Sequence, residues 1–171
     1  CSALSEAHTI GLIHRDIKPA NIFVAQRGGM YDVAKLLDFG LVKAQDGTPE
    51  MHLTREGSLA GSPLYMAPEQ AMGDGEVDVR SDIYSLGGVA YFALTGRPPF
   101  EADHPMKVLV AHARDDVVPP SQIRPGVPDD LESIVLRCLA KQPAQRFQDV
   151  RSLQDSLALC STANKWGERE A

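Results

Sequence analysis

The stretch Ile13–Phe23 reads IHRDIKPANIF and places Asp16, Lys18 and Asn21 within six residues. A carboxylate and a carboxamide offer the hard oxygen ligands that Mg²⁺ prefers, and Mg²⁺ in proteins usually also binds substrate phosphates. A neighbouring lysine supplies a positive charge for a phosphate oxygen, and the acid can accept or orient a hydroxyl proton. The stretch therefore favours phosphoryl-transfer chemistry.

A second acid extends this set. The short apolar runs IFVA and VAKLL flank a glycine-containing segment, which predicts two strands joined in a hairpin. Asp38 follows the second run in LLDFG, so Asp16, Asn21 and Asp38 each lie beside a predicted strand end. We expect these three side chains to form a magnesium site, with Lys18 beside it.

Composition limits the class of protein. A chain of 171 residues with 43% apolar side chains fits one ordinary domain or a large piece of a bigger one. With 17 basic and 23 acidic residues the net charge is -6, which repels phosphate backbones and anionic lipids. We therefore expect no nucleic-acid partner.

The cysteines and the apolar segments bear on location. The three cysteines are widely spaced and form no metal-binding pattern, which favours a reducing compartment. The longest apolar stretch, Ile83–Gly96, is too short to cross a bilayer. We expect a cytoplasmic location, although a parent protein could be anchored in a membrane outside this chain. The chain begins with Cys1, not Met, and is expected to be a fragment.

Helical signals dominate the second half of the chain. A buried central helix is expected to begin near Ser81 and to end at Gly96, with a further helix at 101–114 after it. Another helix is expected to open at Asp129 and Asp130, and the last carries apolar residues at helical spacing. That last set is Phe147, Val150, Leu153 and Leu157. The apolar residues of the region 41–66 recur at neither helical nor strand spacing, so this region is predicted to be a long loop.

Three motifs in order give the chain a family likeness. HRDIKPAN, DFG at 38–40 and APE at 67–69 resemble the eukaryotic-type (Hanks-type) serine/threonine protein kinases. The segments RSDIYSLG and LTGRPPF are similar in style to the bacterial members. The resemblance implies a mainly α fold with a small β-hairpin, which is the C-terminal lobe of the kinase domain. We assign 1–159 to that lobe and 160–171 to a tail or linker.

The resemblance also implies roles for the site residues. Asp16 is the expected catalytic residue that accepts or orients the substrate hydroxyl, and Lys18 steadies the transferred phosphate of ATP. Asn21 and Asp38 are expected to hold Mg²⁺. Lys18 is typical of serine/threonine kinases, so protein serine or threonine is the expected acceptor. ATP, Mg²⁺ and protein substrates are thus the implied cofactors and partners.

Further positions match the family without touching the reacting atoms. Glu69 and Arg146 resemble its buried ion pair, and Asp82 resembles the residue that braces the catalytic loop. The expected supporting set is His14, Arg15, Phe39, Gly40, Glu69, Asp82 and Arg146. The remaining histidines, His8, His52, His104 and His112, match no catalytic position and are interpreted as surface or packing residues.

The segment between Asp38 and Glu69 matches the activation segment of the family. Thr54 and Ser58 are the candidate phosphorylation sites, where a phosphate could pair with Arg15 and order the segment. Ser62 is interpreted as a structural hydroxyl.

The smaller lobe of the family supplies a glycine-rich lid, a phosphate-binding lysine and its partner glutamate. No GxGxxG occurs in the chain, so the isolated piece is expected to bind nucleotide weakly and to be inactive. Two alternatives stay open. Absence of the upstream lysine from the full gene would favour a pseudokinase scaffold, and a start codon mapped just before Cys1 would favour a truncated binding module.

Overall fold

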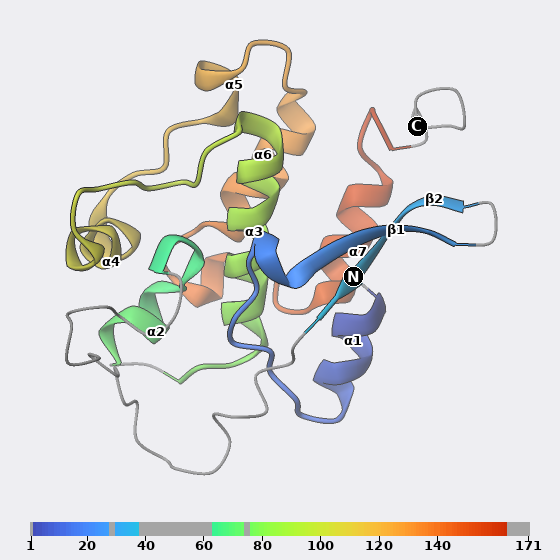
Figure 1. The fold of residues 1–171 in the computed structure, drawn as a ribbon, viewed down its shortest axis with the longest axis horizontal. Helices are drawn as coiled ribbons and strands as arrows, with labels where there is room; N and C mark the ends of the chain where they lie inside the picture. The colour runs from blue at the N-terminus through green and yellow to red at the C-terminus, as the bar shows by residue number, and fades with distance from the viewer. Residues whose placement is uncertain (1, 28–29, 38–62, 74–75, 164–171) are drawn as a thin grey trace.

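The computed structural model describes residues 2–27, 30–37, 63–73 and 76–163, and within them the chain is mostly helical with a two-stranded antiparallel sheet (Figure 1). In chain order the elements are α1 (Ser2–Thr9), the 3₁₀ helix η1 (Pro19–Asn21), β1 (Ile22–Arg27), β2 (Met30–Leu36), the 3₁₀ helix η3 (Pro63–Tyr65), α2 (Pro68–Met72), α3 (Val79–Thr95), α4 (Pro105–Arg114), α5 (Pro120–Ile123), α6 (Asp129–Cys138), the 3₁₀ helix η4 (Pro143–Gln145) and α7 (Val150–Ala158). None of the helices described is long and apolar enough to cross a membrane.

The two apolar runs form the predicted hairpin. β1 pairs with β2 in antiparallel register, from Ile22 opposite Leu36 to Arg27 opposite Met30. Because η1 leads directly into β1, the sheet fixes one end of the loop that carries Asp16.

α3 is the predicted central helix, and 8 of its 17 residues are buried. Its N-terminus is capped by Asp78, whose carboxylate accepts a hydrogen bond from the Arg80 backbone N–H at 2.8 Å. This cap makes the helix begin before the predicted start at Ser81. The predicted end is correct, since Gly96 adopts a left-handed conformation with φ of 78°.

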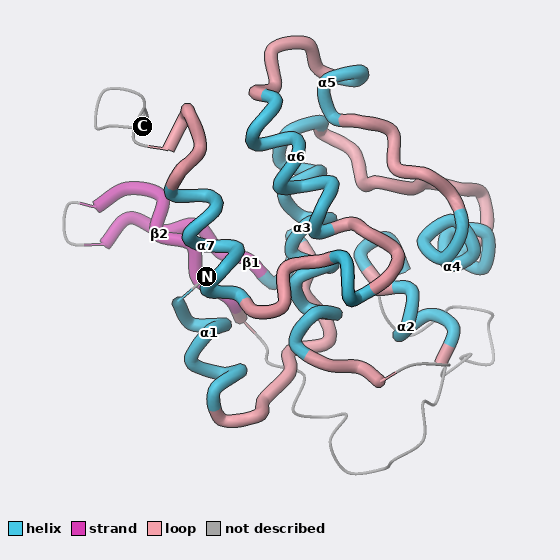
Figure 2. Tube along the Cα trace, turned by 180° about the vertical axis from the view of Figure 1, so that it is seen from behind, coloured by secondary structure: helices cyan, strands magenta, loops and turns pink. Residues whose placement is uncertain are grey.

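Helices α3 and α6 lie side by side, as Figures 1 and 2 both show. Gly87 permits this close approach. A Cβ atom at that position would lie 2.5 Å from the Cβ of Cys138 on α6, well inside van der Waals contact. Any larger residue at 87 therefore has to push the two helices apart.

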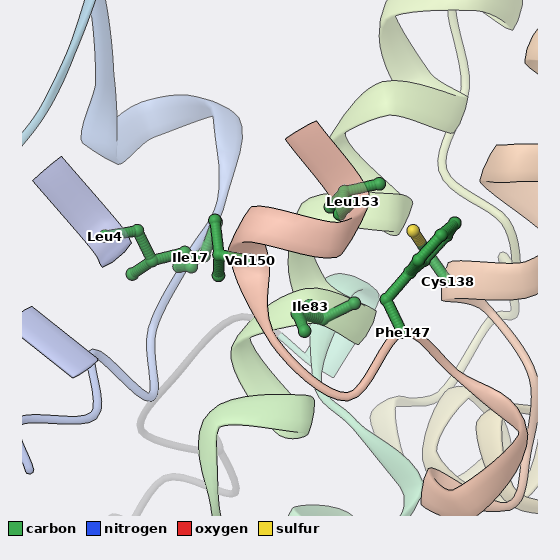
Figure 3. Close-up of a cluster of buried hydrophobic side chains, with 7 residues drawn as sticks. All are labelled: Leu4, Ile17, Ile83, Cys138, Phe147, Val150 and Leu153. Atoms are coloured by element: carbon green, nitrogen blue, oxygen red, sulfur yellow. The ribbon is translucent and has the colours of Figure 1, made fainter. Parts of the chain in front are cut away.

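The main apolar core joins elements that are distant in sequence. Ile83 of α3 packs with Cys138 of α6 and with residues from the two ends of the chain (Figure 3). The full buried cluster is Leu4, Ile17, Ile83, Cys138, Phe147, Val150 and Leu153. Ile17 is 2% exposed, so the core holds the backbone next to Asp16.

Two further expected elements differ in detail, and one short helix was not expected. The helix predicted at 101–114 begins only at Pro105, because the His104 side chain caps it by accepting from the Met106 N–H at 3.1 Å. Phe147 is buried but precedes α7. The proline-rich connector after α4 contains the short helix α5.

Candidate active site

The loop that carries Asp16 is residues 13–21, here called the site loop, and one buried carboxylate anchors its backbone. Asp82 of α3 is fully buried and accepts hydrogen bonds from the backbone N–H groups of His14 and Arg15, both at 2.8 Å. The ring of His8 on α1 contacts the same carboxylate, with Nε2 2.8 Å from Oδ2. Asp82 therefore ties the site loop to the central helix.

Arg15 has an unusual backbone conformation for a residue with a side chain. Its φ is 66°, in the left-handed region, which costs about 1–2 kcal/mol for an L-residue other than glycine. The two hydrogen bonds to Asp82 hold this turn in place. The turn directs the chain from the buried His14 to the half-buried Asp16.

The structure brings together three polar side chains of the site loop, those of Asp16, Lys18 and Asn21. Lys18 Nζ lies 2.8 Å from Asp16 Oδ2, and Asn21 Nδ2 lies 3.3 Å from the same oxygen. Asn21 Nδ2 also donates to the Asp16 carbonyl oxygen at 2.8 Å. Both side-chain donors therefore meet on Oδ2. Within the part of the chain that the structure describes, Oδ1 of Asp16 accepts no hydrogen bond.

The end of the hairpin lies next to this cluster. The Leu37 N–H donates to the Asn21 carbonyl at 2.8 Å, and His14 Nε2 lies 3.0 Å from the Leu37 carbonyl oxygen. The remaining predicted site residues follow Leu37. Asp38, Phe39, Gly40, Thr54, Ser58 and Ser62 all lie outside the described residues.

Glu69 and Arg146 form a buried, bidentate ion pair. Arg146 Nη1 lies 2.7 Å from Glu69 Oε1, and Nη2 lies 2.9 Å from Oε2. Ser81 of α3 adds a third donor, with its hydroxyl 2.6 Å from Oε1. Burial opposes ionisation of Glu69, but the hydrogen bonds from Arg146 and Ser81 and the charge of Arg146 outweigh it and lower the pKa of this carboxyl.

Several residues that support the site have no sequence pattern that identifies them. Ser81 is one of many serines, and nothing in the sequence links it to Glu69. His8 and His112 are interpreted from sequence as surface or packing residues. His112 is fully buried and His8 is partly buried, with its side chain 9% exposed, and both are hydrogen-bonded. Only the fold brings His8 to Asp82 across 74 residues.

Comparison with known proteins gives a consistent result. The family model described as the protein kinase domain matches residues 1–157. Serine/threonine-protein kinase Pkn1 of Myxococcus xanthus is 45% identical over 157 residues, which cover 92% of this chain and 22% of Pkn1. Serine/threonine-protein kinase PknB of Mycobacterium leprae is 44% identical over 158 residues, covering 92% of this chain and 24% of PknB. The chain thus spans less than a quarter of the length of these curated relatives.

Proposed function

This chain belongs to the protein kinase domain family, and we propose that residues 1–159 form the C-terminal lobe of a serine/threonine protein kinase, followed by a tail at 160–171. The whole protein transfers the γ-phosphate of ATP to serine or threonine hydroxyls of protein substrates. The observation that carries this proposal is the convergence of Lys18 and Asn21 on one oxygen of Asp16. The bacterial serine/threonine kinases to which the chain is similar support it.

The chemistry assigned to the site follows from its hydrogen bonds. Asp16 Oδ2 is held by Lys18 and Asn21, so Oδ1 is the oxygen left to orient a substrate hydroxyl and accept its proton. The hydroxyl oxygen forms a bond to the γ-phosphorus as the bond to the bridging oxygen of ADP breaks, and ADP leaves. Lys18 keeps two further N–H donors for an oxygen of the transferred phosphate.

The residues present are suited to a magnesium ion. The Nδ2 group of Asn21 is used by Asp16, which leaves the amide Oδ1 oxygen of this 8% exposed residue for a hard cation. Asp38 is the proposed second protein ligand. When bound, Mg²⁺ neutralises charge on the β- and γ-phosphates.

The direct test compares the full-length parent protein with its Asp16→Asn variant, using Mg²⁺, labelled ATP and a generic protein substrate. Asparagine keeps the size of the side chain but removes the proton acceptor, so we expect phosphate incorporation to fall about 10²- to 10⁴-fold. Equal incorporation by both proteins contradicts the assignment of Asp16. A wild-type protein with no incorporation, in a preparation shown to bind ATP, favours the pseudokinase alternative.

We also propose that phosphorylation of Thr54 or Ser58 regulates the parent protein through Arg15. The Arg15 side chain is exposed and adjoins Asp16, so a phosphate paired with it couples to the site loop. Mass spectrometry of active protein tests this directly. No phosphate anywhere between residues 38 and 69 contradicts the proposal.

The proposal has consequences for the isolated chain and for the location and partners of the protein. We expect residues 1–171 alone to bind nucleotide weakly and to turn over negligibly, because they contain no glycine-rich lid motif. We further propose a cytoplasmic site of action and no nucleic-acid partner. The free thiols at Cys138 and Cys160 support the first assignment, and the net charge of -6 supports the second.

A further inference from the structure

We propose that Gln70 is a positioning residue for Asp16, which links the start of α2 to the site loop. This inference rests on the proposed function, because it concerns the orientation of the proposed catalytic carboxylate. Gln70 does not touch that carboxylate. It acts through the peptide unit that precedes Asp16.

Gln70 uses both ends of its side-chain amide. Nε2 donates to the Arg15 carbonyl oxygen at 3.1 Å, and Oε1 accepts from the Ala67 N–H at 3.3 Å. The first bond crosses 55 residues of sequence and the second caps α2. A glutamine supplies one acceptor and a donor group at the end of a long side chain, so one residue can make both bonds.

The contact with Arg15 fixes a particular peptide unit. The Arg15 carbonyl and the Asp16 N–H belong to one planar peptide. Gln70 holds the carbonyl, and His14 Nδ1 accepts from the N–H at 3.3 Å. With both polar groups of the plane bonded, its rotation is restrained, and so is the direction in which the Asp16 side chain leaves the backbone.

Arg15 needs such restraint because of its backbone conformation. Its φ of 66° is not one that the residue prefers by itself, so its neighbours have to hold it. Asp82 holds the N–H of Arg15 at 2.8 Å, and Gln70 holds its carbonyl. The strained residue is therefore bonded on both sides.

Gln70 contributes little to the core. Its side chain is half-buried and its bond to Arg15 is exposed to solvent, so this hydrogen bond adds little to the stability of the fold. The loss of Gln70 should therefore appear in the rate of the chemical step before it appears in stability. This separates positioning from a merely structural role.

The test uses the full-length parent protein and two variants, Gln70→Glu and Gln70→Met. The glutamate keeps an acceptor for the Ala67 N–H but turns a carboxylate oxygen toward the Arg15 carbonyl, whereas the methionine removes both bonds. We expect kcat to fall about tenfold in both variants, with KM for ATP and for the protein substrate changed less than about twofold. The melting temperature should stay within a few degrees of wild type.

Gln148→Glu is the matched control. Gln148 is exposed, and its Nε2 donates to the carbonyls of Pro143, Ala144 and Arg146. The same exchange of amide for carboxylate therefore occurs there without contact with the site loop. Its kcat should match wild type. A Gln70→Glu variant with wild-type kcat, or one in which only KM changes, overturns the positioning role.

Hydrogen exchange at the Asp16 amide separates this inference from the proposed function, because it does not depend on activity. We expect faster exchange in Gln70→Glu than in wild type and in Gln148→Glu. If wild type transfers no phosphate but exchange responds as expected, the proposed function fails and the restraint by Gln70 stands. If wild type is active and exchange at Asp16 is unchanged in Gln70→Glu, the positioning role is wrong.

Discussion

Two carboxylate–cation pairs in this chain have similar distances and opposite surroundings. Lys18 and Asp16 approach to 2.8 Å with side chains 24% and 37% exposed. Arg146 and Glu69 approach to 2.7 Å with side chains 0% and 8% exposed. The first pair is only partly exposed, but even so such a pair contributes at most about 1 kcal/mol, whereas the breaking of a buried pair costs several. Exposure rather than distance therefore distinguishes the two pairs.

The number of satisfied donors makes the same distinction. All five N–H groups of the Arg146 guanidinium can be assigned to acceptors: two bonds to Glu69 and one each to the carbonyls of Arg80, Ala140 and Lys141. Lys18 uses one of its three donors within the described residues. The buried pair therefore has nothing left to offer a ligand, whereas the exposed pair keeps capacity to bind a phosphate.

The largest effect is expected from breaking the buried pair. Arg146→Met leaves Glu69 buried without its main partner, so the free energy of unfolding should fall by about 3–5 kcal/mol. Chemical denaturation measures this change. The double variant Glu69→Leu with Arg146→Met removes both charges and should recover a large part of the loss. A single variant as stable as wild type would show that the pair is not structural.

The second prediction distinguishes the pH dependence of stability that comes from a buried histidine from that of the ion pair. His112 on α4 is fully buried, with Nδ1 2.8 Å from the Tyr84 hydroxyl. Burial, together with the charge of Lys141, lowers its pKa to about 4, against the opposing effect of the Leu64 and Pro63 backbone. Between pH 6.5 and 4 the unfolded chain binds a proton that the folded chain refuses.

Stability should therefore fall as the pH drops through that window, by roughly 3 kcal/mol in all. Glu69 behaves differently. Its pKa is lowered, so its contribution is lost only as the pH falls through a value below 4.5. His112→Asn removes the titrating ring and should flatten the stability profile between pH 6.5 and 4.5. An unchanged slope in this variant contradicts the assignment to His112.

The part of the fold that sequence predicts well is the part governed by local signals. The hairpin follows from two apolar runs and the end of α3 from Gly96, and the structure confirms both. The predicted start of α3 at Ser81 is two residues late, because Asp78 caps the helix and it begins at Val79. Local patterns do not rank competing cap residues when several polar side chains stand in a row.

The site divides in the same way. Asp16, Lys18 and Asn21 are close in sequence, and their convergence follows from their spacing. The contacts of Asp82 with His8 and of Gln70 with Arg15 span 74 and 55 residues, so they depend on the packing of helices and have no local signature. Sequence therefore predicted the cluster of Asp16, Lys18 and Asn21, but not the contacts that His8 and Gln70 make with its supports.

The third prediction concerns the exposed pair. Lys18→Met removes the cation beside Asp16, and we expect phosphate transfer by the full-length protein to fall about 100-fold, which is about 2.7 kcal/mol. Unfolding free energy should change by less than about 0.5 kcal/mol, as for other exposed pairs. Lys107, which pairs with Asp103 at 2.8 Å on the surface, is the control, and Lys107→Met should leave both quantities unchanged. Loss of stability in Lys18→Met without loss of rate would reverse the distinction between the two pairs.

The smallest expected effect comes from Ser81→Ala, which tests whether the buried Glu69 carboxylate needs its third donor. Ser81→Ala removes the hydroxyl 2.6 Å from Glu69 Oε1 and leaves Arg146 in place, so the unfolding free energy should fall by about 1.5 kcal/mol, the value of a hydrogen bond to a charged group. Ser85 provides the control. It is 3% exposed on the same helix, but its hydroxyl donates to the Ser81 backbone carbonyl at 3.2 Å, so Ser85→Ala should cost less than half as much. Equal losses in the two variants would mean that Ser81 acts only by filling space, and that Arg146 alone keeps Glu69 ionised.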